Sequence, residues 1–98
     1  MVGAVEIELD KTTGKVDIID YVGVLDCGTP INPNLVRIQA EGGIAQGIGM
    51  ALWEDVKFDS SGKLLTDNFM SYKIPSRLDI KNVRIAIAPT YEPTGPFG

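Results

Sequence analysis

Apolar and acidic residues alternate at the start of the chain. From Ala4 to Asp10, apolar side chains occupy every second position and acidic side chains occupy most of the positions between them. Because successive side chains of a strand point to opposite faces of a sheet, this period of two predicts a half-buried strand. A turn at residues 11–14 then leads to residues 15–25, which are rich in Val and Ile and apolar on both faces. The two segments predict a β-hairpin, with the second strand the more central one.

A long helix is predicted from Pro33 to about Leu52. Asn32 is a favoured N-cap, and Pro33 suits the first helical position. Four glycines interrupt the apolar period of this helix, at positions 42, 43, 47 and 49, and each one costs about 1 kcal/mol relative to Ala. Gly43 and Gly47 are one turn apart on the same face. A helix accepts this cost where a strand, another helix or a ligand comes very close, and tight packing on the sheet is the simplest of these explanations.

Further strands are predicted in the second half of the chain. Residues 53–58 alternate between apolar and polar, a turn at residues 59–62 follows, and residues 63–66 form the return strand. Residues 68–74 form another extended segment. Residues 83–88 alternate again, with apolar side chains on one face, and predict the last strand.

These elements mix hairpins with a helix and do not alternate as β-α-β units. The order predicts an α+β fold, with one long glycine-rich helix packed on a largely antiparallel sheet built from hairpins. A chain of 98 residues is expected to form a single domain, residues 1–98. Residues 89–98 contain three prolines and two glycines and show no apolar period, so a loop that is cut in its middle is expected there.

Composition narrows the classes of partner. Hydrophobic residues make up 44% of the chain, which is enough for a core and argues against general disorder. There are 9 basic and 13 acidic residues, a net charge of -4, and no basic cluster, so neither nucleic acid nor an anionic membrane surface is an expected partner. No apolar run approaches the roughly 20 residues of a membrane span. The acidic residues near the N-terminus are unlike a signal peptide.

Cysteine and histidine usage argues against several kinds of catalytic site. Cys27 is the single cysteine and the chain has no His, so a thiol nucleophile lacks its usual base and most metal sites lack a ligand. We expect Cys27 to be a small buried apolar residue in a reducing, cytoplasmic compartment. Glu41, Glu54 and Asp55 are not placed as a pair for acid–base work, and we expect solvated or structural roles for them. No catalytic or metal-binding residue is predicted in this chain.

Two glutamines are the candidate binding residues. Gln39 and Gln46 are seven positions apart, which is two helical turns, and therefore share a face of the predicted helix. Each amide offers two donors and an acceptor, which suits the edge of a heterocycle or a phosphate oxygen. Their spacing alone favours two surface glutamines. The nearby pair Gly47 and Gly49 does not form a dinucleotide-binding motif, because that motif opens a helix and these glycines lie late in one.

Five segments of the chain resemble one protein family. They are Asp-Cys-Gly-Thr-Pro-Ile-Asn-Pro (26–33), Gln-Ala-Glu-Gly-Gly-Ile-Ala-Gln-Gly-Ile-Gly-Met-Ala-Leu (39–52), Asp-Ser-Ser-Gly-Lys-Leu-Leu-Thr (59–66), Tyr-Lys-Ile-Pro-Ser-Arg-Leu-Asp-Ile (72–80) and Pro-Thr-Gly-Pro-Phe-Gly (93–98). Together, in this order and spacing, they are similar to the molybdopterin-binding subunit of the xanthine dehydrogenase / aldehyde oxidase family. The similarity covers a small C-terminal part of a family subunit that is several times longer.

The resemblance implies a cofactor and roles for the two glutamines. Enzymes of this family hydroxylate N-heteroaromatic compounds or aldehydes at a molybdenum that is carried by molybdopterin, with water as the oxygen source. Gln39 matches the family glutamine that hydrogen-bonds the pterin, and Gln46 matches a recurrent family glutamine. The helix glycines would then let the helix approach neighbouring backbone near the cofactor. Two positions depart from the family pattern: Ile38 replaces the usual Gly, and Lys81 replaces a common Pro.

The resemblance also implies that the chain is a fragment. The family's catalytic glutamate lies in a Lys-Gly-x-Gly-Glu motif just beyond the Gly-Pro-x-Gly segment, and this sequence stops at Gly98, before it. We therefore expect the isolated chain to be inactive and to bind no cofactor by itself. Its expected partners are the remainder of the molybdenum subunit and iron–sulfur and flavin subunits or domains. We also expect the helix face with Gly43 and Gly47 to be under-covered and to drive homodimerisation or strand exchange.

An alternative function belongs to another class. The chain would then be a free-standing small protein that holds pterin without catalysis or binds another protein. A mutation of Gln39 that left pterin binding by the assembled enzyme unchanged would favour an interaction module over a cofactor-binding one.

Overall fold

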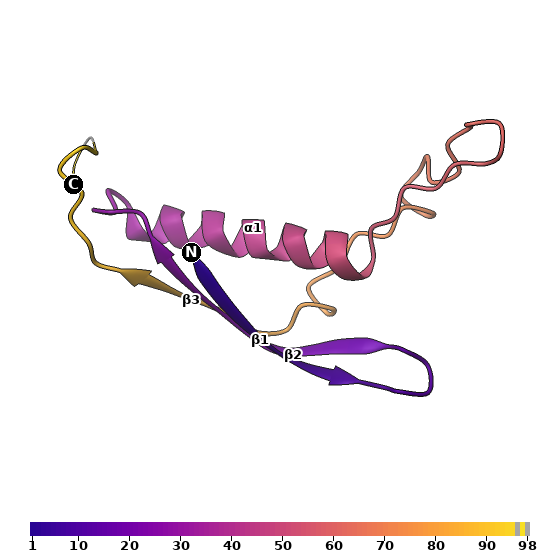
Figure 1. The fold of residues 1–98 in the computed structure, drawn as a ribbon, viewed down its shortest axis with the longest axis horizontal. Coiled ribbons are helices and arrows are strands. Elements are labelled where there is room, and N and C mark those ends of the chain that lie inside the picture. The colour runs from indigo at the N-terminus through magenta and orange to yellow at the C-terminus, as the bar shows by residue number, and fades with distance from the viewer. Residues whose placement is uncertain (96, 98) are drawn as a thin grey trace.

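One helix and three strands make up the regular structure of the computed structural model, which describes residues 1–95 and 97 (Figure 1). β1 (Val2–Leu9) and β2 (Val16–Asp26) form an antiparallel hairpin, and β3 (Val83–Ala88) lies on the other side of β2 and runs parallel to it. α1 (Pro33–Leu52) crosses one face of this sheet. The architecture is compatible with the predicted α+β class. The sheet is mixed rather than largely antiparallel, because β3 reaches it through a crossover that contains α1.

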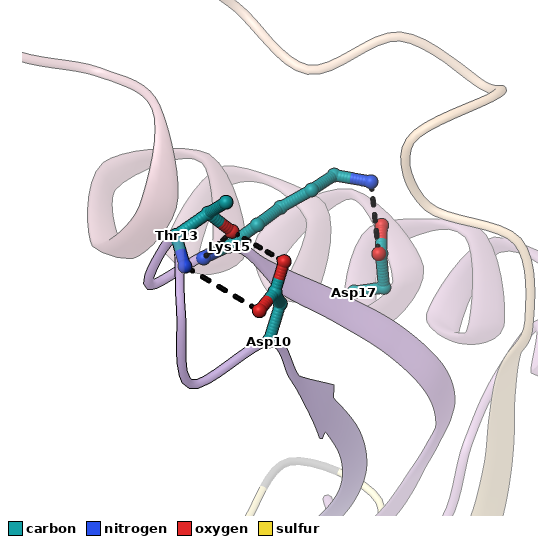
Figure 2. Close-up of polar contacts among 4 residues, drawn as sticks. All are labelled: Asp10, Thr13, Lys15 and Asp17. Carbon is teal, nitrogen blue, oxygen red and sulfur yellow. Dashed lines mark hydrogen bonds and ion pairs between the residues drawn. The ribbon is translucent and has the colours of Figure 1, made fainter.

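The hairpin turn between β1 and β2 is held by Asp10 and by a salt bridge beside it (Figure 2). The carboxylate of Asp10 accepts hydrogen bonds from the Thr13 hydroxyl at 2.7 Å and from the Thr12 backbone N–H at 2.8 Å. Gly14 takes a positive φ of 75°, which a residue with a side chain rarely adopts. Lys15 Nζ lies 2.9 Å from Asp17 on the exposed side of β2. Local polar groups thus define the predicted turn.

A β-bulge in β2 explains the unusual pattern of this strand. Glu6 pairs with Asp20 and Ile7 pairs with Ile18, so Ile19 has no partner on β1. The extra residue changes the parity of the strand, and Ile18 and Tyr21 therefore point to the same face although they are three positions apart. Asp17 and Asp20 point to the opposite face for the same reason. The bulge places the apolar side chains of both halves of β2 against α1.

The core is small and consists of isoleucines. Its buried members are Ile18 of β2, Ile44 and Ile48 of α1, and Ile80 just before β3. Ile44 of α1 packs over Gly23 of β2. A Cβ atom built at Gly23 would lie 3.1 Å from the Cδ1 atoms of both Ile44 and Ile85. Close helix-on-sheet packing therefore depends on a strand glycine, whereas the sequence had suggested the glycines of the helix.

Residues 55–74 form an arm that leaves the body of the molecule at the C-terminal end of α1 (Figure 1). The strands predicted at residues 53–58, 63–66 and 68–74 are absent from this described part of the chain, and one bridge between Phe58 and Leu64 takes their place. The turn between them is present, and Gly62 has a φ of 84°. The prediction of extra strands was wrong because an alternating segment becomes a strand only where another strand is available to pair with it, and the arm reaches no sheet edge.

The arm and the thin sheet leave much of the chain exposed. The radius of gyration is 17.5 Å, against about 13 Å for a compact domain of this length. The accessible surface is 7430 Å², about 2,000 Å² more than the roughly 5,500 Å² expected of a compact monomer of this mass. Much of the surface is apolar, and Phe69 and Met70 in the arm are each 85% exposed. The described residues alone therefore do not cover their own apolar faces.

Candidate functional site

The loop between β2 and α1 is organised by Asp26. Asp26 Oδ1 accepts a hydrogen bond from the Thr90 hydroxyl at 2.5 Å and another from the Gly28 backbone N–H at 3.1 Å. These bonds, that from Thr90 first, lower the pKa of the Asp26 carboxyl below its usual range. Gly28 has a φ of 67° and allows the chain to turn toward the helix. Asp26 thereby ties the end of β2 to the segment that follows β3.

Asn32 then fixes the start and the direction of α1. Its side-chain oxygen accepts a hydrogen bond from the Leu35 backbone N–H at 3.1 Å, and its backbone carbonyl accepts one from the Val36 N–H at 3.0 Å. Pro33 occupies the first turn, where its missing N–H costs nothing. The cap therefore determines where the side chains two turns further along the helix point.

Gln39 lies at the exposed side of the first half of α1. It lines a shallow hollow of about 500 Å³ whose other lining residues are apolar or glycine and include Met1, Leu25, Leu35 and Gly43. Within the described residues its amide makes no hydrogen bond. Gln46 is also exposed and without a hydrogen bond to the described part of the chain. The structure thus leaves both amides free for a ligand or partner, and their role in cofactor binding stays a prediction.

The helix glycines divide into two kinds. At Gly42, Gly43 and Gly47 an added Cβ would meet no atom within 4 Å. At Gly49 an added Cβ would lie 2.9 Å from Pro75 Cδ and would collide with the Glu54 carboxylate. Close packing inside the described chain therefore explains Gly49 alone among these four. The other three leave bare backbone next to the two free amides.

A second, apolar groove of about 530 Å³ adjoins the same face of α1. Gly43, Gly47 and Leu52 border it on the helix, and Val5 and Ile7 border it on β1. Val5 and Ile7 are 52% and 50% exposed. The groove offers shape and apolar surface but no charge, so it is suited to an apolar occupant.

Glu54, Asp55 and Cys27 were also considered as candidates in the sequence, and the structure shows their surroundings. Glu54 Oε2 accepts a hydrogen bond from the Tyr72 hydroxyl at 2.5 Å, and this contact raises the pKa of Tyr72. Asp55 lies 3.4 Å from Lys57 Nζ on the surface. The structural and solvated roles expected for these two carboxylates agree with these contacts. Cys27 is exposed, which contradicts the expectation that it is buried, because the loop that carries it lies at the surface.

No metal site or membrane segment emerges from the part of the chain that the structure describes. Residues 1–95 and 97 contain no cluster of three or more Cys, Asp or Glu side chains arranged to hold an ion. No helix in these residues is long and apolar enough to cross a bilayer.

Comparison with known proteins identifies the family. Residues 1–81 match the family model of the molybdopterin cofactor-binding domain, and the chain belongs to this family. The large subunit of nicotine 6-hydroxylase from Paenarthrobacter nicotinovorans is 44% identical over 73 residues, which are 74% of this chain and 9% of that protein. A probable hypoxanthine oxidase of Escherichia coli is 34% identical over 94 residues, 95% of this chain and 10% of that protein. These matches confirm the resemblance to the xanthine dehydrogenase / aldehyde oxidase family.

Solved structures agree with the sequence matches. Quinoline 2-oxidoreductase from Pseudomonas putida 86 superposes with a TM-score of 0.87 at 43% identity, over 93% of this chain and 12% of that chain. Reconstituted CO dehydrogenase from Oligotropha carboxidovorans gives a TM-score of 0.90 at 26% identity, over 98% of this chain and 12% of that chain. The chain spans about a tenth of the length of the curated relatives that it matches.

The residues at the glutamine face of α1 fit the cofactor of the family. A pterin presents ring nitrogens and an exocyclic amino group, which need donors and acceptors, and a free amide supplies both. Gln39 has such an amide without a partner in the described chain. Gly42 and Gly43 next to it lack side chains and have open space above them, so a flat ring system can approach the backbone. The chemistry of this face is therefore compatible with a pterin.

Proposed function

We propose that this chain is a fragment of the large subunit of a molybdenum-cofactor-dependent hydroxylase and contributes to the binding of molybdopterin. The observation that carries the proposal is the unpaired amide of Gln39 beside the bare backbone of Gly42 and Gly43, on a helix that lies inside the family match. In this proposal Gln39 holds the pterin by hydrogen bonds, and Gln46 contacts it or its surroundings two turns further along α1. Both glutamines act in binding and orientation and not in catalysis.

The proposed reaction is the oxidation of N-heteroaromatic compounds or aldehydes. The relatives named above as nicotine 6-hydroxylase, hypoxanthine oxidase and quinoline 2-oxidoreductase support this substrate class. The cofactor, when bound, supplies the molybdenum at which a substrate carbon gains oxygen from water. We propose that the catalytic base is a glutamate in the remainder of the subunit. The isolated chain is therefore inactive in this proposal and holds no cofactor by itself.

The proposed partners are the remainder of the molybdenum subunit and subunits or domains that carry iron–sulfur clusters and flavin. Several relatives are named as subunits or large chains, among them the gamma subunit of the 6-hydroxypseudooxynicotine dehydrogenase complex. The exposed apolar surface of the described chain is suited to such contacts. The proposed compartment is the cytoplasm, which agrees with a single free cysteine.

Substitution of Gln39 in the assembled enzyme tests the proposal. We expect Gln39→Ala to lower the pterin and molybdenum content of the purified enzyme several-fold, because the ring edge loses its amide partner. Asn34→Ala provides a matched control, since it removes an exposed amide from the same helix near its N-terminus. Equal cofactor content in the wild type and both variants would contradict a role for Gln39 in binding.

The isolated chain allows a second test. We expect no turnover of purines, aldehydes or N-heteroaromatic compounds by the purified 98-residue polypeptide. Hydroxylation that co-purifies with this chain and disappears with its removal would contradict its inactivity.

One observation favours the alternative of a non-catalytic interaction module. The exposed face of α1 that contains Leu35, Gln39, Gln46 and Met50 carries no charged residue, whereas solvent-exposed helix faces are usually polar. Such a face is typical of a surface that another polypeptide covers.

A further inference from the structure

Asp26 joins two segments of the chain just past the end of the sheet. It is the last residue of β2 and pairs with Ala88, the last residue of β3, where the ladder between these strands ends. The hydrogen bond from the Thr90 hydroxyl to Asp26 Oδ1 joins the same two segments again beyond this pair. Asp26 therefore holds the chain together at a place where the backbone ladder no longer does so.

The same oxygen of Asp26 also fixes the loop that leads to α1. Oδ1 accepts a hydrogen bond from the backbone N–H of Gly28. Gly28 is buried and takes the positive φ that turns the chain toward the helix. Asn32, at the end of this loop, caps α1. The direction in which α1 leaves the sheet thus depends on a turn that Asp26 closes.

The hollow beside Gln39 has one wall on each side of this turn. Leu25, the residue before Asp26, lines the hollow from β2, and Leu35 and Val36 line it from the first turns of α1. Leu35 and Val36 also line a neighbouring hollow, which Asp26 borders. Asp26 therefore lies at the junction from which both walls of the Gln39 hollow extend.

We propose that Asp26 is a positioning residue for cofactor binding, which sets the place of the Gln39 amide relative to Leu25 by holding the end of β2 to the turn before α1 and to Thr90. This inference rests on the proposed role of Gln39 in holding the pterin. Asp26 itself does not touch the cofactor. A group that binds a ligand has to be held to within about 0.5 Å by the hydrogen bonds of the residues around it, and Asp26 supplies two such bonds.

The acceptor oxygen of Asp26, and not its charge, is the feature on which the positioning depends. Both hydrogen bonds end at Oδ1, and the amide oxygen of an asparagine can accept both. A carboxylate makes stronger hydrogen bonds than a neutral amide, so Asp26→Asn is expected to keep the geometry with weaker bonds. Asp26→Ala removes both bonds, and Thr90→Val removes the bond to the segment after β3 alone.

The hairpin turn between β1 and β2 provides a matched control. Asp10 accepts hydrogen bonds from the Thr13 hydroxyl and the Thr12 backbone N–H, which is the combination of groups that Asp26 binds. This turn lies at the opposite end of β2 from Asp26. Asp10→Ala therefore removes an equivalent set of bonds at a place that does not border the Gln39 hollow.

The cofactor content of the assembled enzyme tests the positioning role. We expect Asp26→Ala and Thr90→Val each to lower the molybdenum content of the purified enzyme several-fold. Asp26→Asn is expected to keep most of it, and Asp10→Ala to leave it unchanged. Full content in Asp26→Ala, or equal losses in Asp26→Ala and Asp10→Ala, would overturn the proposal. A loss in Asp26→Asn as large as that in Asp26→Ala would overturn the assignment to the acceptor oxygen.

A double variant tests whether Asp26 acts through Gln39. In a Gln39→Ala background, Asp26→Ala is expected to cause no further loss of cofactor, because the amide that it positions is already gone. Two independent roles would instead give losses that multiply, and that result would overturn the proposal. Full cofactor content in Gln39→Ala would contradict the proposed function. A loss in Gln39→Ala without one in Asp26→Ala would contradict the positioning role alone.

Hydrogen exchange in the assembled enzyme without cofactor gives a readout that does not depend on binding. We expect Asp26→Ala to speed the exchange of backbone amides in residues 27–36 several-fold, because the turn before α1 loses its acceptor. Asp26→Asn and Asp10→Ala are expected to leave the exchange of this segment near that of the wild type. Unchanged exchange in Asp26→Ala would show that Asp26 does not hold the start of α1 and would overturn the proposal.

Discussion

The side-chain amide of Asn82 donates a hydrogen bond to the backbone carbonyl of Ile19, the bulged residue of β2, at 3.2 Å. The backbone carbonyl of Asn82 also accepts a hydrogen bond from the Tyr21 N–H at 3.0 Å. Asn82 thus satisfies the backbone on both sides of Asp20, where the ladder is interrupted. The bulge decides which side chains of β2 face α1, and this contact from a residue 63 positions away holds the backbone at the bulged residue.

Removal of the Asn82 side chain is expected to destabilise the fold modestly. Asn82→Ala leaves the Ile19 carbonyl without its donor, and we expect the free energy of unfolding to fall by about 1 kcal/mol. Urea unfolding followed by circular dichroism measures the change. Asn34→Ala is the control, because it removes an amide from an exposed helical position without a recorded hydrogen bond. A loss of stability in the control as large as that in Asn82→Ala would contradict a specific role at the bulge.

Replacing glycine by alanine is expected to change the stability of the fold in opposite directions in β2 and in α1. Gly23→Ala places a methyl group 3.1 Å from the ends of both Ile44 and Ile85, and we expect a loss of about 1–3 kcal/mol through overpacking. Gly47→Ala adds a methyl group in open space and raises helix propensity, so a gain of up to about 1 kcal/mol is expected. Thermal unfolding of the two variants at one protein concentration checks both. Equal signs would show that the helix–sheet contact at Gly23 is not tight in solution.

Ionisation of Tyr72 is expected to detach the base of the arm. The hydrogen bond to Glu54 raises the pKa of Tyr72 above its ordinary value of about 10. A raised pKa means that the stabilising contact is fully present below about pH 10 and is lost as the pH rises through the folded-state pKa. We expect Glu54→Gln to return the Tyr72 titration toward its ordinary position, with the phenolate followed by its ultraviolet absorbance.

A Tyr72→Phe variant identifies the signal in that titration. It removes one of the three tyrosines of the chain, so the transition that disappears belongs to Tyr72 and is expected above the ordinary value of about 10. A Tyr72 transition at or below that value would show that the hydrogen bond to Glu54 does not form in solution.

Sequence patterns were sufficient for the elements whose boundaries are local. The Asn32-Pro33 pair marks the start of α1, and Gly14 and Gly62 mark turns that need positive φ. Apolar residues on both faces of residues 15–25 predicted a central strand, and β2 lies between β1 and β3 in the sheet. Part of this apolar pattern comes from the bulge at Ile19, which changes the face to which the neighbouring side chains point. Alternation from Val83 onward also predicted the apolar face of β3.

Other features depend on contacts between distant residues and could not be read from the pattern. Alternation around Phe58 predicted a strand pair, but pairing requires a sheet edge that the arm does not reach. The parallel direction of β3 depends on the crossover through α1. The sequence did not show that Ile44 would pack over Gly23, because a glycine in a strand can also mark a bulge.

The sequence predicted which residues form the candidate site but not what surrounds them. Gln39 and Gln46 were expected on one face from their spacing, and the structure leaves their amides without partners in the described chain. Open space at Gly43 and Gly47 agrees with the expectation that this face of the helix is under-covered, but the glycine pattern does not say what covers it. Exposure of Cys27 did not follow from its residue type, because burial of a loop residue depends on which parts of the chain pack over the loop.

The parallel pairing of β2 with β3 has a consequence for the order in which the chain assembles. β1 and β2 are joined by a short turn, and such a hairpin closes in microseconds. β3 joins the sheet only after the loop of residues 27–82 has closed. The chain loses conformational entropy in this closure before the contacts of β3 can form. We therefore expect the hairpin to be the nucleus onto which α1 collapses. On this route Ile80 and Asn82 complete the core and the bulge in the final, slow step.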